Sequence, residues 1–211
     1  RGLSMGTGDT TEAVDDPDMV ALFKEFLDKE EEVHVFHEGT KPHAQPYHYV
    51  VRDTEQRGLF LHDGRLVATS LQGANNAQEG GYPGWAGGGT STHGCFHSPH
   101  LLVEPISVVP NPVLERWRCP LIVGIRGGTQ ALSCGTGPEP QLKIEEVGLL
   151  DLFSRGAEAT PYTFYKTYGG STHTFEAAAF PGLFLSAAPG LGEALTLAAP
   201  PAITAFYLRR K

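Results

Sequence analysis

Short apolar runs separated by turn residues dominate the chain from residue 47 onward. Gly, Pro, Asn and Asp lie between neighbouring runs, which is typical of short strands joined by tight turns. The pattern predicts twelve strands, at residues 47–52, 58–62, 65–69, 106–109, 121–126, 130–134, 141–146, 162–166, 172–177, 182–186, 194–198 and 203–208. Only residues 148–154 indicate a helical turn among them, so we expect an all-β sandwich or barrel.

Part of this pattern recurs. Gly58-Leu59-Phe60-Leu61 is repeated letter for letter as Gly182-Leu183-Phe184-Leu185. Three hairpin-like units align: residues 59–61 with 66–68, 131–133 with 142–144, and 183–185 with 195–197. The units start 72 and 52 residues apart, and a Gly/His-rich insertion at about residues 79–103 accounts for the excess of 20. Four strands recurring three times predict a β-trefoil.

A helical pattern precedes the strands. Asp16-Pro17 is a helix-start signal, and residues 17–31 carry apolar side chains at helical spacing: Met19, Leu22, Phe23, Phe26 and Leu27. This amphipathic helix could dock on the body of the protein or on a partner. The alternative is a marginal helix in a flexible extension. Residues 1–16, rich in Gly, Thr and acids, are expected to be disordered.

Charge divides the chain at the same place. Residues 1–46 hold 11 acidic and 4 basic residues, a net charge of −7, whereas residues 47–211 hold 13 and 12, a net charge of −1. We therefore expect an acidic extension, 1–46, and one folded domain, 47–211. The sequence has no stripe of basic residues, so it gives no indication of a nucleic-acid partner. No apolar run approaches the ~20 residues of a membrane span, and the polar start does not resemble a secretory signal.

Few residues suggest catalytic or metal chemistry. The cysteines Cys95, Cys119 and Cys134 are odd in number and are expected to be free thiols. A His/Cys cluster in the insertion (His93, Cys95, His97, His100) and a looser set (His34, His37, His43, His48) have zinc-ligand chemistry. Both lack a scaffold that would fix a tetrahedral site. We find no nucleophile elbow or phosphate-binding loop, so we expect no metal, no cofactor and no enzymatic activity.

Several motifs resemble one protein family. Residues 175–185 read Phe-Glu-Ala-Ala-Ala-Phe-Pro-Gly-Leu-Phe-Leu, similar to the signature Phe-Glu-Ser-Ala-Ala-x-Pro-Gly-Trp-Phe-Leu of the interleukin-1 cytokines. Three further stretches, residues 121–134, 142–147 and 203–207, resemble the family in the same order. Residues 106–111 and 132–135 are most similar to the interleukin-36 group and its receptor antagonist.

The resemblance implies a secreted, monomeric ligand that acts in inflammation and innate immunity. Its partners would be an interleukin-1-receptor-family chain and that receptor's accessory chain. Release would follow a leaderless route from the cytoplasm. Family members lose an N-terminal extension by cleavage, so residues 1–46 resemble a removable pro-segment. Val51 and Asp53 lie where the interleukin-36 group has an Ala-x-Asp landmark, a short way downstream of the cleavage site.

The resemblance and the loop chemistry together suggest receptor-binding residues: Asn111, Glu115, Arg116, Trp117, Thr204, Ala205 and Tyr207. An exposed Trp beside Arg is typical of an interface anchor; the alternative is a ring folded back over the barrel. Ala205 replaces the acid of the antagonist motif Ile-Thr-Asp-Phe-Tyr, as in agonists of the group. The alternative is a tolerated small residue, so agonist and antagonist both stay open.

A second function class is a carbohydrate-binding β-trefoil, because lectins share this architecture. Such modules usually place an aromatic residue and an acid in each repeated pocket. Trp85 and Trp117 do not recur with the repeat, which disfavours this alternative.

Overall fold

The computed structural model describes residues 16–33, 44–70, 103–190 and 192–211. In these ranges one antiparallel sheet dominates the regular structure. Its strands are β1 (Tyr47–Asp53), β2 (Arg57–His62), β3 (Arg65–Ser70), β4 (Ile106–Pro110), β5 (Pro120–Ile125), β6 (Gln130–Ser133), β7 (Lys143–Glu145), β8 (Thr163–Gly169), β9 (Thr172–Ala177), β10 (Phe184–Ser186), β11 (Thr196–Ala198) and β12 (Phe206–Arg210). All twelve predicted strands are present, within a few residues of their expected bounds.

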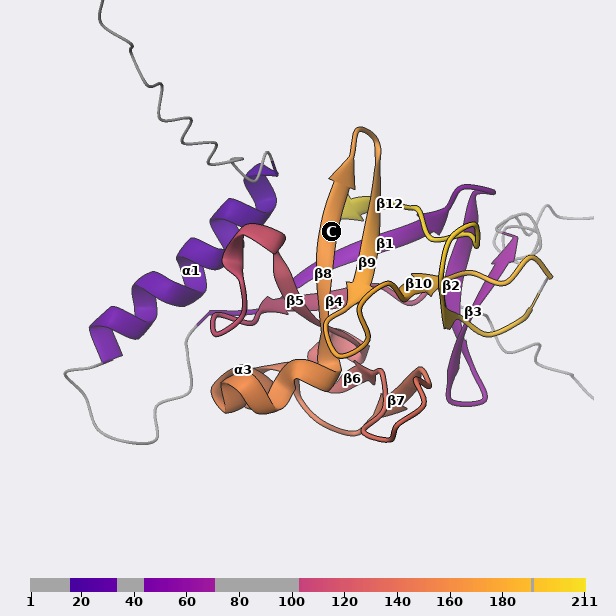
Figure 1. The fold of residues 1–211 in the computed structure, drawn as a ribbon. Coiled ribbons are helices and arrows are strands. Elements are labelled where there is room, and N and C mark those ends of the chain that lie inside the picture. The colour runs from indigo at the N-terminus through magenta and orange to yellow at the C-terminus, as the bar shows by residue number, and fades with distance from the viewer. Residues whose placement is uncertain (1–15, 34–43, 71–102, 191) are drawn as a thin grey trace, which may run out of the picture.

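Six strands close into a barrel (Figure 1). β1 pairs with β12 and β4, β5 pairs with β4 and β8, and β9 pairs with β8 and β12. Each of the six therefore has a partner on both sides, which leaves the barrel without a free edge. The other six strands form the hairpins β2–β3, β6–β7 and β10–β11. This arrangement is a β-trefoil, and the predicted fold class is confirmed.

The three repeated units are the three hairpins. Leu59 lies opposite Ala68 in the first, Leu132 opposite Ile144 in the second, and Leu185 opposite Leu197 in the third. The Leu195 N–H also donates to the Leu66 carbonyl over 2.8 Å, which joins the third hairpin to the first. The letter-for-letter repeat therefore marks equivalent strands, β2 and β10.

Large apolar side chains fill the barrel. The fully buried core residues on and beside the barrel strands include three phenylalanines and several aliphatic residues: Phe164, Phe175, Phe206, Leu121, Ile122, Ile125 and Leu132. Burying one such side chain contributes roughly 1.5–3 kcal/mol. β4 and β5 are buried along their whole length, and the burial of these residues stabilises the closed barrel.

The N-terminal helix α1 (Pro17–Val33) packs against the barrel (Figure 1). Asp16 caps it, because its Oδ1 accepts the Asp18 N–H over 3.1 Å. Met19, Leu22 and Phe26 are buried, and the Phe26 ring lies 5.1 Å from that of Phe153, centroid to centroid. The interpretation of residues 17–31 as a marginal helix in a flexible extension is therefore wrong. The expectation for residues 1–15 lies outside the described residues.

A second helix, α3 (Leu149–Arg155), follows β7 at the predicted place. Its buried residues are Leu149, Leu152 and Phe153. Gly124 in β5 makes room for it: a Cβ there would lie 2.2 Å from the Gln130 carbonyl oxygen and 2.8 Å from Leu149 Cδ2. Across the described ranges, no helix combines the length and apolar composition that a bilayer span requires.

Two of the three cysteines are described, and both are buried free thiols. Burial raises the pKa of Cys119 to about 12, with the nearby Lys166 charge opposing the shift. Burial likewise raises the pKa of Cys134 to about 12. Cys95 lies outside the described residues.

The two histidine sets lie mostly outside the described residues. This holds for His93, His97 and His100, for His34, His37 and His43, and for the insertion up to residue 102. His48 is described, and its Nδ1 lies 2.7 Å from the Ser107 Oγ. Among the residues that the structure describes, no three His, Cys, Asp or Glu side chains form a metal-ligand group.

Candidate functional site

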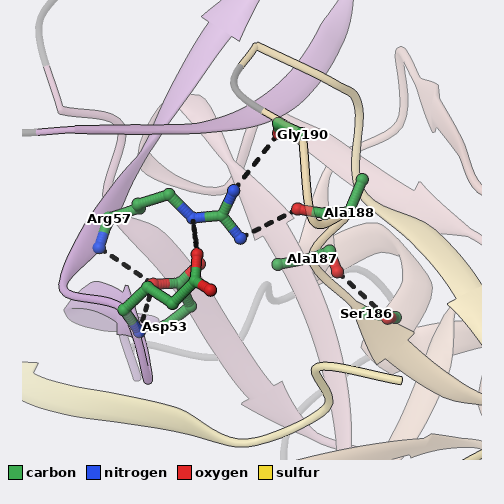
Figure 2. Close-up of polar contacts among 7 residues, drawn as sticks. Asp53, Arg57, Ser186, Ala187, Ala188 and Gly190 are labelled. Carbon is green, nitrogen blue, oxygen red and sulfur yellow. Dashed lines mark hydrogen bonds and ion pairs between the residues drawn. The ribbon is translucent and has the colours of Figure 1, made fainter. Parts of the chain in front are cut away.

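The end of β1 carries a buried ion pair (Figure 2). The Asp53 Oδ2 lies 2.7 Å from the Arg57 Nε, and the two side chains are 0% and 4% exposed. The Asp53 Oδ1 also accepts the backbone N–H groups of Glu55 and Arg57, over 3.0 and 2.8 Å. The carboxylate therefore fixes the turn between β1 and β2.

Arg57 extends this contact to a distant loop. Its Nη2 donates to the Ala188 carbonyl over 2.8 Å and its Nη1 to the Gly190 carbonyl over 3.2 Å (Figure 2). Charge-assisted bonds of this kind are stronger than neutral ones. We call Asp53, Arg57 and the two carbonyls the Asp53 clamp. It connects the β1–β2 turn to the loop between β10 and β11.

The two predicted landmark residues are thus internal. Val51 is 2% exposed and Asp53 is fully buried. Their side chains are not available to a protease or a receptor in the folded protein. Their value as a landmark of cleavage stays a prediction, but the physical role of Asp53 in the fold is the clamp.

Asn111 is an anchor rather than a surface residue. It is fully buried, and its Nδ2 donates to the Thr163 Oγ1 over 3.0 Å and to the Gly156 carbonyl over 3.2 Å. Its backbone N–H donates to the Pro120 carbonyl. Asn111 therefore cannot contact a receptor directly, contrary to its inclusion among the surface candidates. It holds both ends of the loop between β4 and β5.

The middle of that loop is exposed. Glu115, Arg116 and Trp117 lie at the 3-10 turn η1 (Arg116–Arg118), and Trp117 is 70% exposed. The alternative that Trp117 folds back over the barrel is wrong. Arg118 supports the turn: its guanidinium carbon lies 3.9 Å from the Tyr165 ring centroid, and its Nη2 lies 2.9 Å from the Glu176 Oε1.

The remaining candidates lie near β12. Thr204 and Ala205 precede the strand and Tyr207 belongs to it, and all three are half-buried. The sheet separates them from η1, because β12 pairs with β9, β9 with β8, and η1 contacts β8. The structure therefore assigns the predicted contact residues to two sets, one on each side of the β8–β9 hairpin.

Large exposed apolar side chains lie on α1, on the loop between β4 and β5, and on β8. Within the described ranges they are Val20, Val113, Trp117 and Tyr168. A groove of about 230 Å³ lies between α1 and η1, lined by Met19, Val20, Phe23, Leu27, Arg116 and Cys119. Val113 and Trp117 share the β4–β5 loop with the exposed Glu115 and Arg116, a composition that indicates a candidate interaction surface. We call Glu115, Arg116, Trp117 and Val113 the Trp117 surface.

The contribution of α1 could not be read from the sequence. Its acidic residues bind basic and polar groups of the barrel: Asp16 forms a hydrogen-bonded ion pair with the buried Lys166, and the Asp18 carboxylate lies 3.3 Å from Arg210. The Tyr47 hydroxyl donates to Glu25 over 2.8 Å. Burial opposes ionisation of Asp16, but the hydrogen bond and charge of Lys166 prevail and lower its pKa below the usual value. The helix spacing alone contained no signal for these long-range partners.

A six-stranded barrel with three hairpins and an exposed aromatic loop defines a β-trefoil protein suited to recognition through its loops. A family model described as "Interleukin-1 / 18" matches residues 111–206. The human interleukin-36 receptor antagonist protein is 40% identical over 167 residues, which cover 76% of this chain and 92% of that protein. Human interleukin-1 family member 10 is 31% identical, over 77% of this chain and 93% of that protein. The chain belongs to the interleukin-1 family.

Solved structures agree on the fold. Chicken interleukin-1 beta superposes with a TM-score of 0.54 at 19% identity, over 78% of this chain and 96% of that one. The pro-inflammatory cytokine interleukin-36alpha gives 0.54 at 22% identity, over 83% and 99%. The 40% identity to the human interleukin-36 receptor antagonist protein confirms the family that the sequence motifs resemble, and a carbohydrate-binding module is not favoured. The relatives are cytokines, a class of proteins that are not enzymes.

Proposed function

We propose that this chain is an extracellular ligand of an interleukin-36-type receptor and modulates inflammatory and innate immune signalling. The observation that carries the proposal is the 40% identity to the human interleukin-36 receptor antagonist protein, extending over 92% of that protein's length. Such coverage includes nearly the whole barrel and its loops. The partner is then an interleukin-1-receptor-family chain, bound by a monomer of this protein.

The Trp117 surface is the proposed primary contact. Trp117 and Arg116 lie side by side on a turn that Asn111 and Arg118 hold in place. Trp and Arg are among the residue types most enriched at binding hot spots. A rigid loop presenting both reduces the ordering cost of binding a receptor.

The residues near β12 are proposed to determine the response. An acid at position 205 would have to be desolvated at a partner's surface, which is costly unless the acid is paired. Ala205 removes this cost and favours recruitment of an accessory chain, the agonist outcome. The overall similarity to a receptor antagonist favours the opposite outcome, and signalling assays separate the two.

The N-terminal extension is proposed to be a removable pro-segment. The acidic residues 1–46 precede the barrel, and α1 covers Cys119 and lies beside Arg116. Removal of α1 would expose a new part of the barrel next to the Trp117 surface. Leaderless release from the cytoplasm and cleavage upstream of Val51 complete this proposal.

The test uses the full chain and a form that starts near Pro42, each in a binding assay and in reporter cells bearing the interleukin-36 receptor. We expect saturable binding and either activation or block of a known agonist. Trp117→Ala should weaken binding by roughly thirtyfold, as expected for a hot spot worth about 2 kcal/mol. Tyr168→Ala, an exposed aromatic on the β8–β9 hairpin, is the matched control.

The outcomes are distinct. Activation that is lost in Ala205→Asp supports the agonist. Block of a known agonist without activation supports the antagonist. Absence of binding by both forms would overturn the proposed function, whatever the reporter shows.

A further inference from the structure

A cavity of about 460 Å³ lies between the three hairpins. The β2–β3 hairpin contributes residues 64–66, the β6–β7 hairpin contributes residues 132 and 140–144, and the segment leading through β11 contributes residues 194–197. Small-molecule sites in proteins usually measure roughly 300–1,000 Å³. The cavity is separate from the Trp117 surface, and no residue of that surface lines it.

Part of the cavity wall is aliphatic. Six leucine and isoleucine side chains line it: Leu66, Leu132, Leu142, Ile144, Leu195 and Leu197. Leu66, Leu132 and Leu195 are buried, and the other three are half-buried. Each of the three hairpin units supplies at least one of them, so the internal repeat itself builds the apolar floor. A hydrocarbon chain covering this floor would gain roughly 25 cal/mol for each Å² removed from water.

Two cations stand at the rim. Arg65 and Lys143 line the cavity and are exposed, and no Asp or Glu is among its lining residues. Within the described ranges, neither cation has a recorded ion pair or side-chain hydrogen bond. The neighbouring Asp63 carboxylate lies 3.2 Å from the His62 Nε2. The rim therefore presents positive charge beside an apolar floor.

The cavity is held on one side by backbone bonds. The Leu195 N–H donates to the Leu66 carbonyl over 2.8 Å, and Val67 and Ala194 form an isolated β-bridge. These contacts fix the first and third hairpins relative to each other, so this part of the site exists before any ligand arrives. Preformed sites bind more tightly because less motion is lost.

We propose that this cavity binds a single-chain amphiphile with an anionic head group, of the medium-chain fatty carboxylate type. The chain lies on the six aliphatic residues, and Arg65 and Lys143 bind the carboxylate. The aliphatic residues suit the hydrocarbon chain, and the two cations that line the cavity suit the carboxylate. The site is independent of receptor binding, and its failure would leave the proposed function untouched.

The test is an NMR titration of the full chain with decanoate, kept below the concentration at which decanoate forms micelles. We expect saturable amide shifts confined to residues 64–66, 140–144 and 194–197. Decanol, which has the chain without the charge, and acetate, which has the charge without the chain, should each bind at least about tenfold more weakly.

Variants separate the two parts of the site. Arg65→Gln with Lys143→Gln should weaken decanoate binding at least about tenfold, whereas Arg209→Gln, an exposed cation that does not line the cavity, should leave it unchanged. Thr196→Trp should fill the cavity and abolish the shifts. Absence of saturable shifts, equal binding of decanol, or unchanged binding in the double variant would overturn the proposal.

Discussion

Arg57 joins parts of the chain that are 131 residues apart, through one guanidinium group. It binds Asp53 within its own turn and the Ala188 carbonyl across the barrel. Hydrogen bonds within the protein satisfy the buried Asp53 carboxylate and most of the donors of the Arg57 guanidinium group. A buried charge with this many partners stabilises one arrangement of the chain, and loss of either partner leaves the other charge uncompensated.

Replacing Arg57 by Ala should therefore destabilise the protein severely. Removing one partner of a buried ion pair costs about 3–5 kcal/mol, and here the Asp53 carboxylate would be left buried without its cation. Urea unfolding of the full chain, monitored by circular dichroism, measures the change.

The exposed Arg116→Ala is the control, with an expected change within about 0.5 kcal/mol. In addition, Asp53→Asn combined with Arg57→Met should recover part of the loss, because no unpaired charge remains. A loss in Arg57→Ala no larger than that in Arg116→Ala would contradict the role of the clamp.

His173 should make stability depend on pH. Burial, followed by the charge of Lys166, lowers its pKa to about 4, so the folded protein holds it neutral where the unfolded chain binds a proton. Stability should thus fall as pH decreases from about 6.5 to 4. In His173→Asn, the slope of the unfolding free energy against pH should decrease by up to the contribution of about one proton. Urea titrations at several pH values measure this slope.

Asp16 acts on the other side of that range. Its pKa is lowered, so the stabilisation by its pair with Lys166 is present above the ordinary carboxyl pKa and is lost only as pH falls through its lowered value.

Equal slopes of the unfolding free energy between pH 6.5 and 4 in the wild type and in His173→Asn would contradict the assignment of this pH dependence to His173.

At the scale of elements, the positions of the strands could be predicted from the sequence, but the surface against which α1 packs could not. Short apolar runs and Gly/Pro turns indicate where each strand lies, and these are local signals. The spacing of Met19, Leu22 and Phe26 predicts an apolar helix face but not what covers it. The partner of that face is formed by α3 and the barrel, from residues far along the chain.

The same limit applies to the candidate site. Trp117 was expected at the surface and is found there, whereas Asn111 in the same loop is buried. A polar residue in a loop suggests exposure, yet the Asn111 side-chain amide donates hydrogen bonds to the Thr163 hydroxyl and the Gly156 carbonyl. These two partners follow Asn111 in the chain by 52 and 45 residues. Such partners depend on how the barrel closes, and no local pattern encodes them.

Phe26→Ala should destabilise the whole chain if α1 is part of the core. A buried Phe replaced by Ala costs about 3–5 kcal/mol, because the cavity beside Phe153 would remain unfilled. Thermal unfolding followed by calorimetry should show a lower Tm for a single transition. Phe23→Ala, at a half-buried position on the same helix, should cost less; equal and negligible effects would mean that α1 folds independently of the barrel.

At the scale of the molecule, the reactivity of the two buried thiols shows whether the protein unfolds cooperatively. Cys119 and Cys134 are buried, with pKa values raised to about 12, and the thiolate is the reactive form. A thiol reagent should therefore modify them only after global unfolding, at a rate that rises with urea as the folded fraction falls.

Intact-protein mass spectrometry with peptide mapping distinguishes these two sites from Cys95. Cys119→Ser and Cys134→Ser, each made separately, identify the thiol that reacts. Rapid modification of Cys119 in the absence of denaturant would show that α1 opens without the barrel, since the groove beneath α1 includes Cys119.

The pairing of β1 with β12 brings the start and the end of the barrel together. Tyr49 lies opposite Arg210, and the Lys211 N–H donates to the His48 carbonyl over 3.0 Å. A short peptide could therefore bridge the two ends, and the chain could be opened instead at a tight turn such as Gly169-Gly170. Circular permutation should preserve the trefoil, since its threefold architecture does not require that the polypeptide begin in the first repeat.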